Sequence, residues 1–352
     1  MLGIAPHAGG VHSLTTLASM AVPASLLEAR NLQKSFTSGT GLFRSAPPVQ
    51  AVVGVSFDIG PGETLGLVGE SGSGKSTIGR LITRLLTPTA GTIRLEGRDI
   101  TGLNARAMRP LRRVVQTVFQ DPFSSLNPRL TAAHLVGEPL VIHNMARGKD
   151  LRTRVAGLFE SVGLHPEQMD RYPHEFSGGQ RQRLAIARAL SVQPRLIVAD
   201  EPVSALDVSI QASVINLLVS LQERHGLAYL FISHDMAVVE HISHRVAVLY
   251  LGKIVEIADR KMLFASPQHP YTEALLSAVP IADPRAPRRE RIVLKGDLPS
   301  PSKPPSGCRF HTRCPYVFER CRVEEPAMRE IKPGQWAACH LRLSSSTSKG
   351  KP

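Results

Sequence analysis

A short glycine-rich segment, residues 69–76, combines the residue types needed to bind a chain of phosphate groups. It reads Gly-Glu-Ser-Gly-Ser-Gly-Lys-Ser and fits the pattern G-x-x-x-x-G-K-[ST]. Glycines let the backbone wrap closely around an anion, Lys75 can neutralise the β- and γ-phosphates of a nucleotide, and the Ser76 hydroxyl can bind Mg²⁺. An apolar run at 64–68 reads as a buried strand, and residues 77–82 read as the start of a helix. This context, with a helix N-terminus directed at the anion, is the one that the motif requires.

Two acidic residues, Asp200 and Glu201, follow the apolar run at 196–199. A carboxylate at the carboxyl end of a parallel strand faces the ligand crevice of an α/β sheet. Asp200 suits the surroundings of a Mg²⁺ ion, and Glu201 suits a general base that orients an attacking water. A strand-end acid pair is often only a solvated surface feature, so this interpretation depends on the phosphate-binding segment.

Gln120 and His234 also follow apolar runs, at 118–119 and 229–233. Gln120 could bind Mg²⁺ or touch the γ-phosphate, and His234 could donate a hydrogen bond to a phosphate oxygen. Taken alone, each is more often a loop residue or a structural residue.

A second anion cradle is predicted at Ser177, Gly178 and Gly179, which open a helix with Gln180. A serine at the N-cap followed by glycines exposes backbone N–H groups at a helix N-terminus. One nucleotide needs one such cradle. The second therefore suggests a site that serves the nucleotide of another chain.

The elements that would position these residues follow from hydrophobic periodicity. Helical periodicity dominates from about 121 to 190, whereas strands alternate with helices after 195. Alternation of this kind predicts a mostly parallel sheet that is covered on both faces and interrupted by a helical insert. The expected strands are 27–32, 51–59, 92–95, 196–199, 228–233 and 245–250, with a Gly/Ser/Pro-rich loop at 37–48, and the expected helices are 131–140, 151–162, 180–190, 210–225 and 236–242.

Composition narrows the class of protein. The chain has 352 residues, 42% of them hydrophobic, and a net charge of +13 that is concentrated after residue 284. A basic segment suggests an anionic partner or a solvated arginine-rich surface. No apolar run reaches the ~18 residues that span a bilayer, so a cytosolic chain that reaches a membrane only through a partner is expected. Residues 1–26 read as a disordered leader, with Met20 as a possible true start, and 344–352 read as a disordered tail.

The motifs occur in one order that closely resembles an ATP-binding cassette (ABC) transporter ATPase over about residues 28–260. The matching motifs are the phosphate-binding segment, Gln120, Phe176–Gln180, Val198–Glu201, Ser204–Asp207 and Ser233–Asp235. The resemblance implies an α/β P-loop NTPase (RecA-like) core with an antiparallel β subdomain and a helical insert. It places the ATPase domain at 27–262, with a helical subdomain at about 121–190. Phe176 departs from the family, where many members carry leucine.

The same resemblance implies the cofactors ATP and Mg²⁺ and a role for each motif residue. Glu201 would be the catalytic base and His234 the γ-phosphate sensor, while Asp207 would lie in the loop that crosses a dimer interface. Phe36 would stack on adenine. The phosphates would be held by Gly69, Glu70, Ser71, Gly72, Ser73, Gly74, Lys75, Ser76 and Thr77, Mg²⁺ by Ser76, Gln120 and Asp200, and the partner's ATP by Ser177, Gly178, Gly179 and Gln180.

Flanking segments resemble the oligopeptide/dipeptide importer branch of this family, which also contains nickel importers. They are Phe119–Pro122, Ser125–Arg129, Asp200–Ser209, His269–Thr272 and Lys295–Pro301. The branch implies a second ATPase subunit, identical or different, two integral membrane permease subunits and, indirectly, an extracytoplasmic solute-binding protein. The chain would then sit at the cytoplasmic face of the inner membrane. A soluble ABC ATPase acting on nucleic acid is the rival class, but a single cassette without a long insert disfavours it.

Four cysteines, the only ones in the chain, lie in a C-terminal region expected at 263–343. Cys308, Cys314, Cys321 and Cys339 are separated by five, six and 17 residues. Disulfides are unusual in a reducing compartment, zinc sites usually contain a closely spaced cysteine pair, and iron–sulfur clusters tolerate irregular spacing. Iron–sulfur, zinc and free thiols remain open on spacing alone. The resemblance to the importer's C-terminal region implies a [4Fe–4S] cluster.

Overall fold

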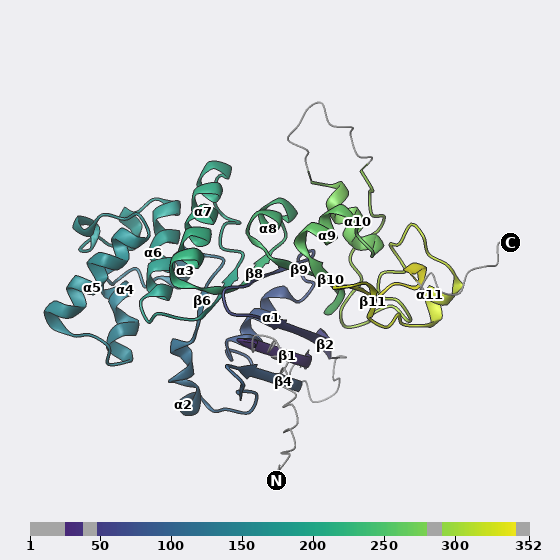
Figure 1. Ribbon diagram of the computed structural model, residues 1–352, viewed down its shortest axis with the longest axis horizontal. Coiled ribbons are helices and arrows are strands. Elements are labelled where there is room, and N and C mark those ends of the chain that lie inside the picture. The colour runs from purple at the N-terminus through teal and green to yellow at the C-terminus, as the bar shows by residue number, and fades with distance from the viewer. Residues whose placement is uncertain (1–24, 38–47, 280–290, 343–352) are drawn as a thin grey trace, which may run out of the picture.

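The computed structural model describes residues 25–37, 48–279 and 291–342. These residues form a four-stranded antiparallel sheet with the order β2-β1-β4-β5 and an eight-stranded sheet with the order β11-β12-β10-β9-β3-β8-β7-β6 (Figure 1). The expected tail lies outside the described residues. The expected leader also lies outside them, apart from its last two residues, and so does the interior of the expected loop at 37–48.

The larger sheet has a parallel centre. Strands β6, β7, β8, β3 and β9 pair side by side in parallel, and β10 pairs antiparallel with β9. Continuous apolar sequences suit these strands because both faces of the sheet are covered. The strands are β3 (Thr64–Val68), β6 (Val115–Val118), β7 (Leu196–Asp200), β8 (Ala228–Ser233), β9 (Arg245–Tyr250) and β10 (Lys253–Asp259).

Helices and the smaller sheet cover the two faces. On one face, the core joins α1 (Lys75–Ile82) and the antiparallel sheet to the parallel strands. On the other face, α7 (Val208–His225) and α8 (Met236–Ile242) pack against the same strands. The antiparallel sheet consists of β1 (Leu27–Phe36), β2 (Val49–Ile59), β4 (Ala90–Leu95) and β5 (Arg98–Asp99).

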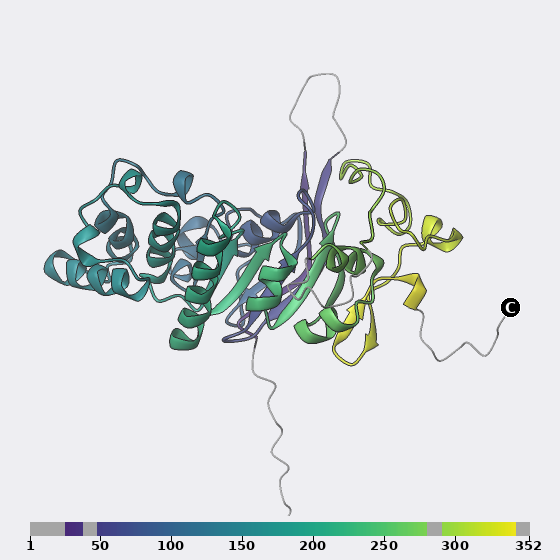
Figure 2. The ribbon, with the colours of Figure 1, turned by 90° about the horizontal axis from the view of Figure 1, so that it is seen from above.

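A helical region follows β6 and precedes β7, as the periodicity predicted. Its three longer helices start and end within three residues of the predicted bounds. Figure 2 shows this region and the C-terminal region at opposite ends of the molecule. The helices are α3 (Pro122–Ser125), α4 (Ala132–Ile142), α5 (Gly148–Ser161) and α6 (Gly178–Leu190), and α2 (Ala105–Met108) precedes β6.

The described part of the C-terminal region is rich in loops, and it is joined to the large sheet. Its strand β12 (Gln335–Ala337) pairs with β10 and extends the large sheet. The buried carboxylate of Glu256 on β10 accepts hydrogen bonds from the Gln335 side chain and from the His269 N–H. The region also contains α9 (Arg260–Ala265), α10 (Pro270–Ser277), α11 (Glu319–Val323) and β11 (Arg329–Lys332).

Short 3₁₀ turns occur at Leu111–Arg113, Pro166–Gln168, Pro173–Glu175 and His340–Arg342. Among the described residues, none of the helices combines the length and the apolar character needed to cross a bilayer.

Candidate nucleotide-binding site

The phosphate-binding segment connects the end of β3 to the start of α1, as its sequence context predicted. Two of its glycines are required by close packing. Gly69 has φ 155° and Gly74 has φ 107°, and a Cβ atom would lie 2.2 Å from the Leu249 carbonyl oxygen and 2.3 Å from that of Ala51. Any other residue would push the segment away from these strands. These two glycines therefore let the loop lie directly against β9 and β2.

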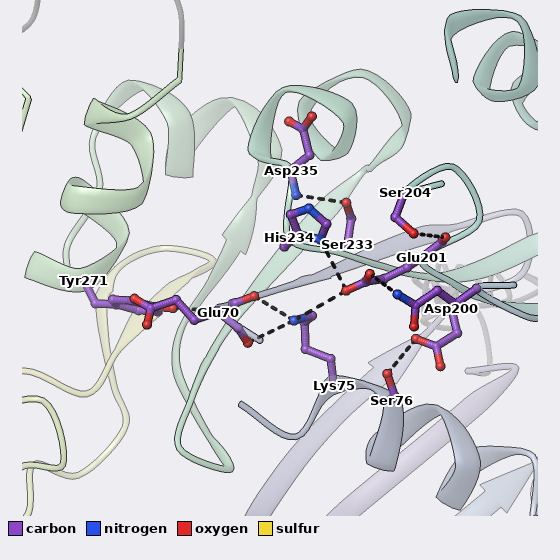
Figure 3. A network of polar contacts seen from close by, with 12 residues as sticks. Glu70, Lys75, Ser76, Asp200, Glu201, Ser204, Ser233, His234, Asp235 and Tyr271 are labelled. Carbon is purple, nitrogen blue, oxygen red and sulfur yellow. Dashed lines mark hydrogen bonds and ion pairs between the residues drawn. The ribbon is translucent and has the colours of Figure 1, made fainter. Parts of the chain in front are cut away.

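Lys75 lies inside this loop. Its Nζ donates to the carbonyl oxygens of Gly69 at 2.7 Å and of Glu70 at 3.1 Å (Figure 3). Burial lowers the pKa of Lys75, and the neighbouring carboxylates oppose this shift. The ammonium group is thus fixed by the loop that it completes, in a position suited to bind phosphate oxygens.

Ser76 and Asp200 form an oxygen pair between α1 and the end of β7. The Ser76 Oγ donates to the Asp200 carboxylate at 2.9 Å. Burial raises the pKa of Asp200, and the hydrogen bond from Ser76 partly offsets this effect. A hydroxyl and a buried carboxylate are donors that suit Mg²⁺, and a cation would stabilise the carboxylate in its charged form.

Glu201 is the centre of the polar network. One carboxylate oxygen lies 3.3 Å from the His234 Nδ1 and 3.9 Å from the Lys75 Nζ, and the other accepts a hydrogen bond from the Gln120 Nε2 at 2.9 Å. The Glu201 side chain is 14% exposed. The ends of β6 and β8 and the phosphate-binding loop therefore each present one functional group to a carboxylate that follows β7. Figure 3 shows Lys75 and His234 beside this carboxylate.

The backbone of Glu201 is unusual, and this feature was missed by sequence reasoning. Its φ of 48° lies in the left-handed region, which few non-glycine residues adopt. The conformation is held by a hydrogen bond from the Glu201 N–H to the Ile232 carbonyl and by the Ser204 hydroxyl, which donates to the Glu201 carbonyl. Such strain persists where the surrounding structure maintains it, frequently at active sites.

The second cradle is formed but lies apart from this network. Ser177 caps α6 through reciprocal hydrogen bonds with Gln180, and Ser177 and Gly178 are exposed. Within the described ranges, neither Ser177 nor Gln180 forms a hydrogen bond or ion pair with Lys75 or Glu201. Asp207 begins α7, and the Val208 side chain beside it is 82% exposed. A single chain thus keeps its two predicted cradles separate.

Phe36 occupies the end of β1 with a partly exposed ring, and the Lys34 ammonium lies 5.2 Å from the ring centroid. A ring in this position is available for stacking. Its contact with adenine remains a prediction.

Two further residues contact the loop, although sequence reasoning did not place them at the nucleotide site. The Glu70 N–H donates to the Tyr271 hydroxyl, and Arg313 forms an ion pair with the Glu70 carboxylate. Their separation from Glu70, by 201 and 243 positions, left no local signal to find.

The four cysteines are brought together as the clustering suggested. All are free, and they line one small cavity together with His311 and His340. Burial raises the pKa of Cys308 and of Cys314 to about 11, so these thiols are protonated at neutral pH. Over the ranges that the structure covers, no three His, Cys, Asp or Glu side chains are grouped so that they could hold a metal ion.

The family of the chain is shown by its relatives. The model for "ABC transporter" matches residues 52–204, and the model for "Oligopeptide/dipeptide transporter, C-terminal region" matches residues 255–321. The Oligopeptide transport ATP-binding protein AppF of Bacillus subtilis is 55% identical over 319 residues, which cover 90% of this chain and 97% of that protein. The chain belongs to the ABC transporter ATP-binding proteins of the oligopeptide/dipeptide type.

Further comparisons agree with this membership of the ABC family. The "Probable peptide ABC transporter ATP-binding protein y4tS" of Sinorhizobium fredii is 52% identical over 328 residues, which cover 93% of each chain. A solved dimeric structure of the ATP-binding cassette MJ0796, in a post-hydrolysis state with ADP and Pi, has a TM-score of 0.59 and 30% identity. It covers 66% of this chain and 98% of that one. The predicted fold class is confirmed, and the chain is an ABC-type ATPase.

Proposed function

We propose that this chain is the ATP-hydrolysing subunit of an importer that takes up dipeptides or oligopeptides. The observation that carries the proposal is the convergence of Lys75, Gln120 and His234 on the Glu201 carboxylate, beside a formed phosphate-binding loop. The peptide cargo is supported by the C-terminal family match and by the names of the relatives. A nickel or other solute importer would use the same site.

ATP binding would use the loop first. N–H groups of the segment Gly69–Thr77 surround the phosphates, except that of Glu70, which donates to the Tyr271 hydroxyl. Lys75 donates to the β- and γ-phosphate oxygens. Phe36 stacks on adenine. Ser76, Asp200 and Gln120 supply oxygen donors for Mg²⁺, which neutralises part of the phosphate charge when bound.

Hydrolysis would depend on Glu201. Its carboxylate orients a water molecule and accepts the proton as the water oxygen attacks the γ-phosphorus and the bond to ADP breaks. His234 and Gln120 hold this carboxylate in the ground state. His234, whose side chain is 57% exposed, can also donate to the γ-phosphate.

Two ATPase chains would pair head to tail. Ser177, Gly178, Gly179 and Gln180 of one chain then contact the ATP held by the loop of the other, and Asp207 crosses the interface. The exposure of Ser177 and the separation of the two cradles support this arrangement. The second chain is either another copy or a related ATPase.

Pairing of the two ATPase chains would drive transport through two integral membrane permeases. Because the chain would bind these permeases, it would lie peripherally on the cytoplasmic face of the inner membrane. An extracytoplasmic solute-binding protein would deliver the cargo. Nucleotide-driven closure moves the permeases only if ATP binds the closed dimer more tightly than the open one.

The cysteine cavity would hold a [4Fe–4S] cluster, with zinc as the alternative. Four thiols along one cavity support the cluster, because its ligands bind four different iron atoms and need not converge on one point. A single zinc ion would require that convergence. Cys339→Ser should therefore remove the absorbance at about 400 nm of protein prepared without oxygen. A colourless wild type that contains stoichiometric zinc would contradict the cluster.

Isolation of the tagged chain from its own membranes tests the transport function. The expected complex contains two integral membrane proteins, and after reconstitution into vesicles it should show ATP-dependent uptake of a labelled dipeptide. Uptake of Ni²⁺ without uptake of peptide would show that the cargo is nickel and not a peptide. Recovery with DNA or ribosomes, and without membrane proteins, would contradict the proposal.

A further inference from the structure

Glu70, the second residue of the phosphate-binding loop, is held by two residues from the C-terminal region. The Tyr271 hydroxyl accepts a hydrogen bond from the Glu70 N–H at 2.9 Å (Figure 3). The Arg313 Nη1 lies 3.0 Å and 2.9 Å from the two carboxylate oxygens of Glu70 and donates to both. Backbone and side chain of this one loop residue are therefore both fixed from outside the cassette.

The two contacts rest on a buried aromatic cluster. The ring of Tyr250, at the end of β9, lies 4.8 Å from that of Tyr271 and 5.2 Å from that of Phe310, between centroids. The Arg313 N–H donates to the Phe310 carbonyl at 3.0 Å, so the turn that carries Arg313 is anchored by a buried ring. Arg313 has little freedom to leave Glu70.

The net charge of the phosphate-binding loop indicates a function for the ion pair between Arg313 and Glu70. Between residues 69 and 77, Glu70 is the sole acidic residue and Lys75 the sole basic one, so the loop by itself has no net charge. Its ligand, in contrast, is a triphosphate. The Arg313 side chain is only 9% exposed and that of Glu70 is 29% exposed. An interaction shielded from water to this degree is stronger than one between solvated side chains.

A second arginine of the same turn ties the C-terminal region to the cassette at another point. The Arg309 guanidinium donates to the Leu251 carbonyl and to the Gln50 side chain. The Gly252 N–H, one residue further on, donates to the Ser73 carbonyl within the loop. The turn between Cys308 and Cys314 thus reaches the loop from two directions.

We propose that Arg313 is a positioning residue for ATP binding. It neutralises and orients Glu70 so that the loop presents a net positive charge to the triphosphate. The C-terminal region thereby sets the ATP affinity of the cassette. This inference rests on the proposed function only in requiring that the loop binds ATP.

Equilibrium titration of the full-length chain with a fluorescent ATP analogue and Mg²⁺ tests the proposal. Arg313→Gln should raise the Kd about tenfold, because it leaves a carboxylate uncompensated beside the phosphates. Glu70→Gln should lower the Kd, because it removes the one acidic side chain of residues 69–77. The double variant should return to within about twofold of the wild type, since the net charge of the pair is restored.

The control variants separate this effect from a folding defect. Arg320→Gln removes an arginine of the same region that pairs with Glu324 instead, and its Kd should match the wild type. Arg313→Lys should recover most of the affinity. Lys75→Ala should bind no nucleotide, which establishes that the loop is the site measured.

Two results would overturn the proposal while leaving the ATPase function intact. One is wild-type affinity in Arg313→Gln. The other is a loss of affinity that Glu70→Gln does not restore, because this would assign Arg313 a purely structural role. Failure of the wild type itself to bind ATP would instead contradict the proposed function.

Discussion

The side-chain amide of Gln120 donates to the Glu201 carboxylate at 2.9 Å across 81 positions of sequence. Gln120 lies between β6 and the helical region, whereas Glu201 directly follows β7. A movement of the helical region that displaces Gln120 would therefore release one oxygen of the carboxylate. This contact offers a direct route by which partner proteins bound to the helical region could influence hydrolysis.

Replacement of the base gives the sharpest test of the catalytic assignment. Glu201→Gln should lower ATP hydrolysis by about 10²-fold or more, because the amide cannot accept the proton of the attacking water. ATP binding should be retained. Light scattering with ATP should show a stable dimer that the wild type forms only transiently. Glu223→Gln, on α7 and exposed, should behave as the wild type. Normal ATP turnover in Glu201→Gln would show that Glu201 is not the catalytic base.

Lys75 should be required for nucleotide binding. In the wild type, ATP with Mg²⁺ should raise the melting temperature, since a ligand that binds the folded state stabilises it. Lys75→Ala should lose this shift because the phosphates lose their buried cation. Lys261→Ala, an exposed lysine on α9, is the matched control and should keep it. If Lys75→Ala kept the full shift in melting temperature, the nucleotide would bind at a site other than this loop.

Local patterns explain why much of the site could be predicted. The phosphate-binding segment carries its own glycines, lysine and serine, and the flanking strand and helix follow from adjacent residues. Asp200 and Glu201 are also local, because they end an apolar strand whose parallel neighbours direct them to one edge. These features depend on backbone geometry within a few residues, which sequence spacing encodes.

Other features depend on contacts that no spacing encodes. Arg313 is one of 42 basic side chains, and nothing near it in sequence indicates that Glu70 is its partner. Strand β12 has three residues, too few for a recognisable alternation, so its pairing with β10 was not foreseen. The positive φ of Glu201 is accompanied by a hydrogen bond from its N–H to the Ile232 carbonyl on the neighbouring strand, a contact distant in the sequence.

Buried His269 should make stability depend on pH. Burial lowers its pKa from 6.5 to about 3, so below pH 6.5 the unfolded chain binds a proton that the folded chain does not. The free energy of unfolding should fall as the pH drops below 6.5, by up to about 1.4 kcal/mol per pH unit for this group. Denaturant unfolding at several pH values measures the slope.

A matched variant isolates this contribution. His269→Asn keeps an acceptor for the Tyr271 N–H at the start of α10 but does not titrate. Its stability should change less steeply between about pH 6.5 and about pH 5 than that of the wild type. The raised pKa of Glu256 acts in the opposite direction, with stability lost as the pH rises, and it is common to both proteins. Equal slopes would show that His269 does not contribute.

Gly179 tests whether hydrolysis needs the second cradle. A Cβ atom there would lie 2.6 Å from the Ile210 Cγ2, so alanine must push the start of α6 away from α7. In Gly179→Ala, each chain should still bind ATP through its own loop, but the displaced cradle should slow hydrolysis by about tenfold or more. Gly157→Ala on α5 adds the same methyl group where no atom lies within 4 Å, and its activity should be unchanged. If both variants hydrolysed ATP at the wild-type rate, the position of the Ser177 cradle would not matter to the reaction, and the head-to-tail dimer would lose its chemical basis.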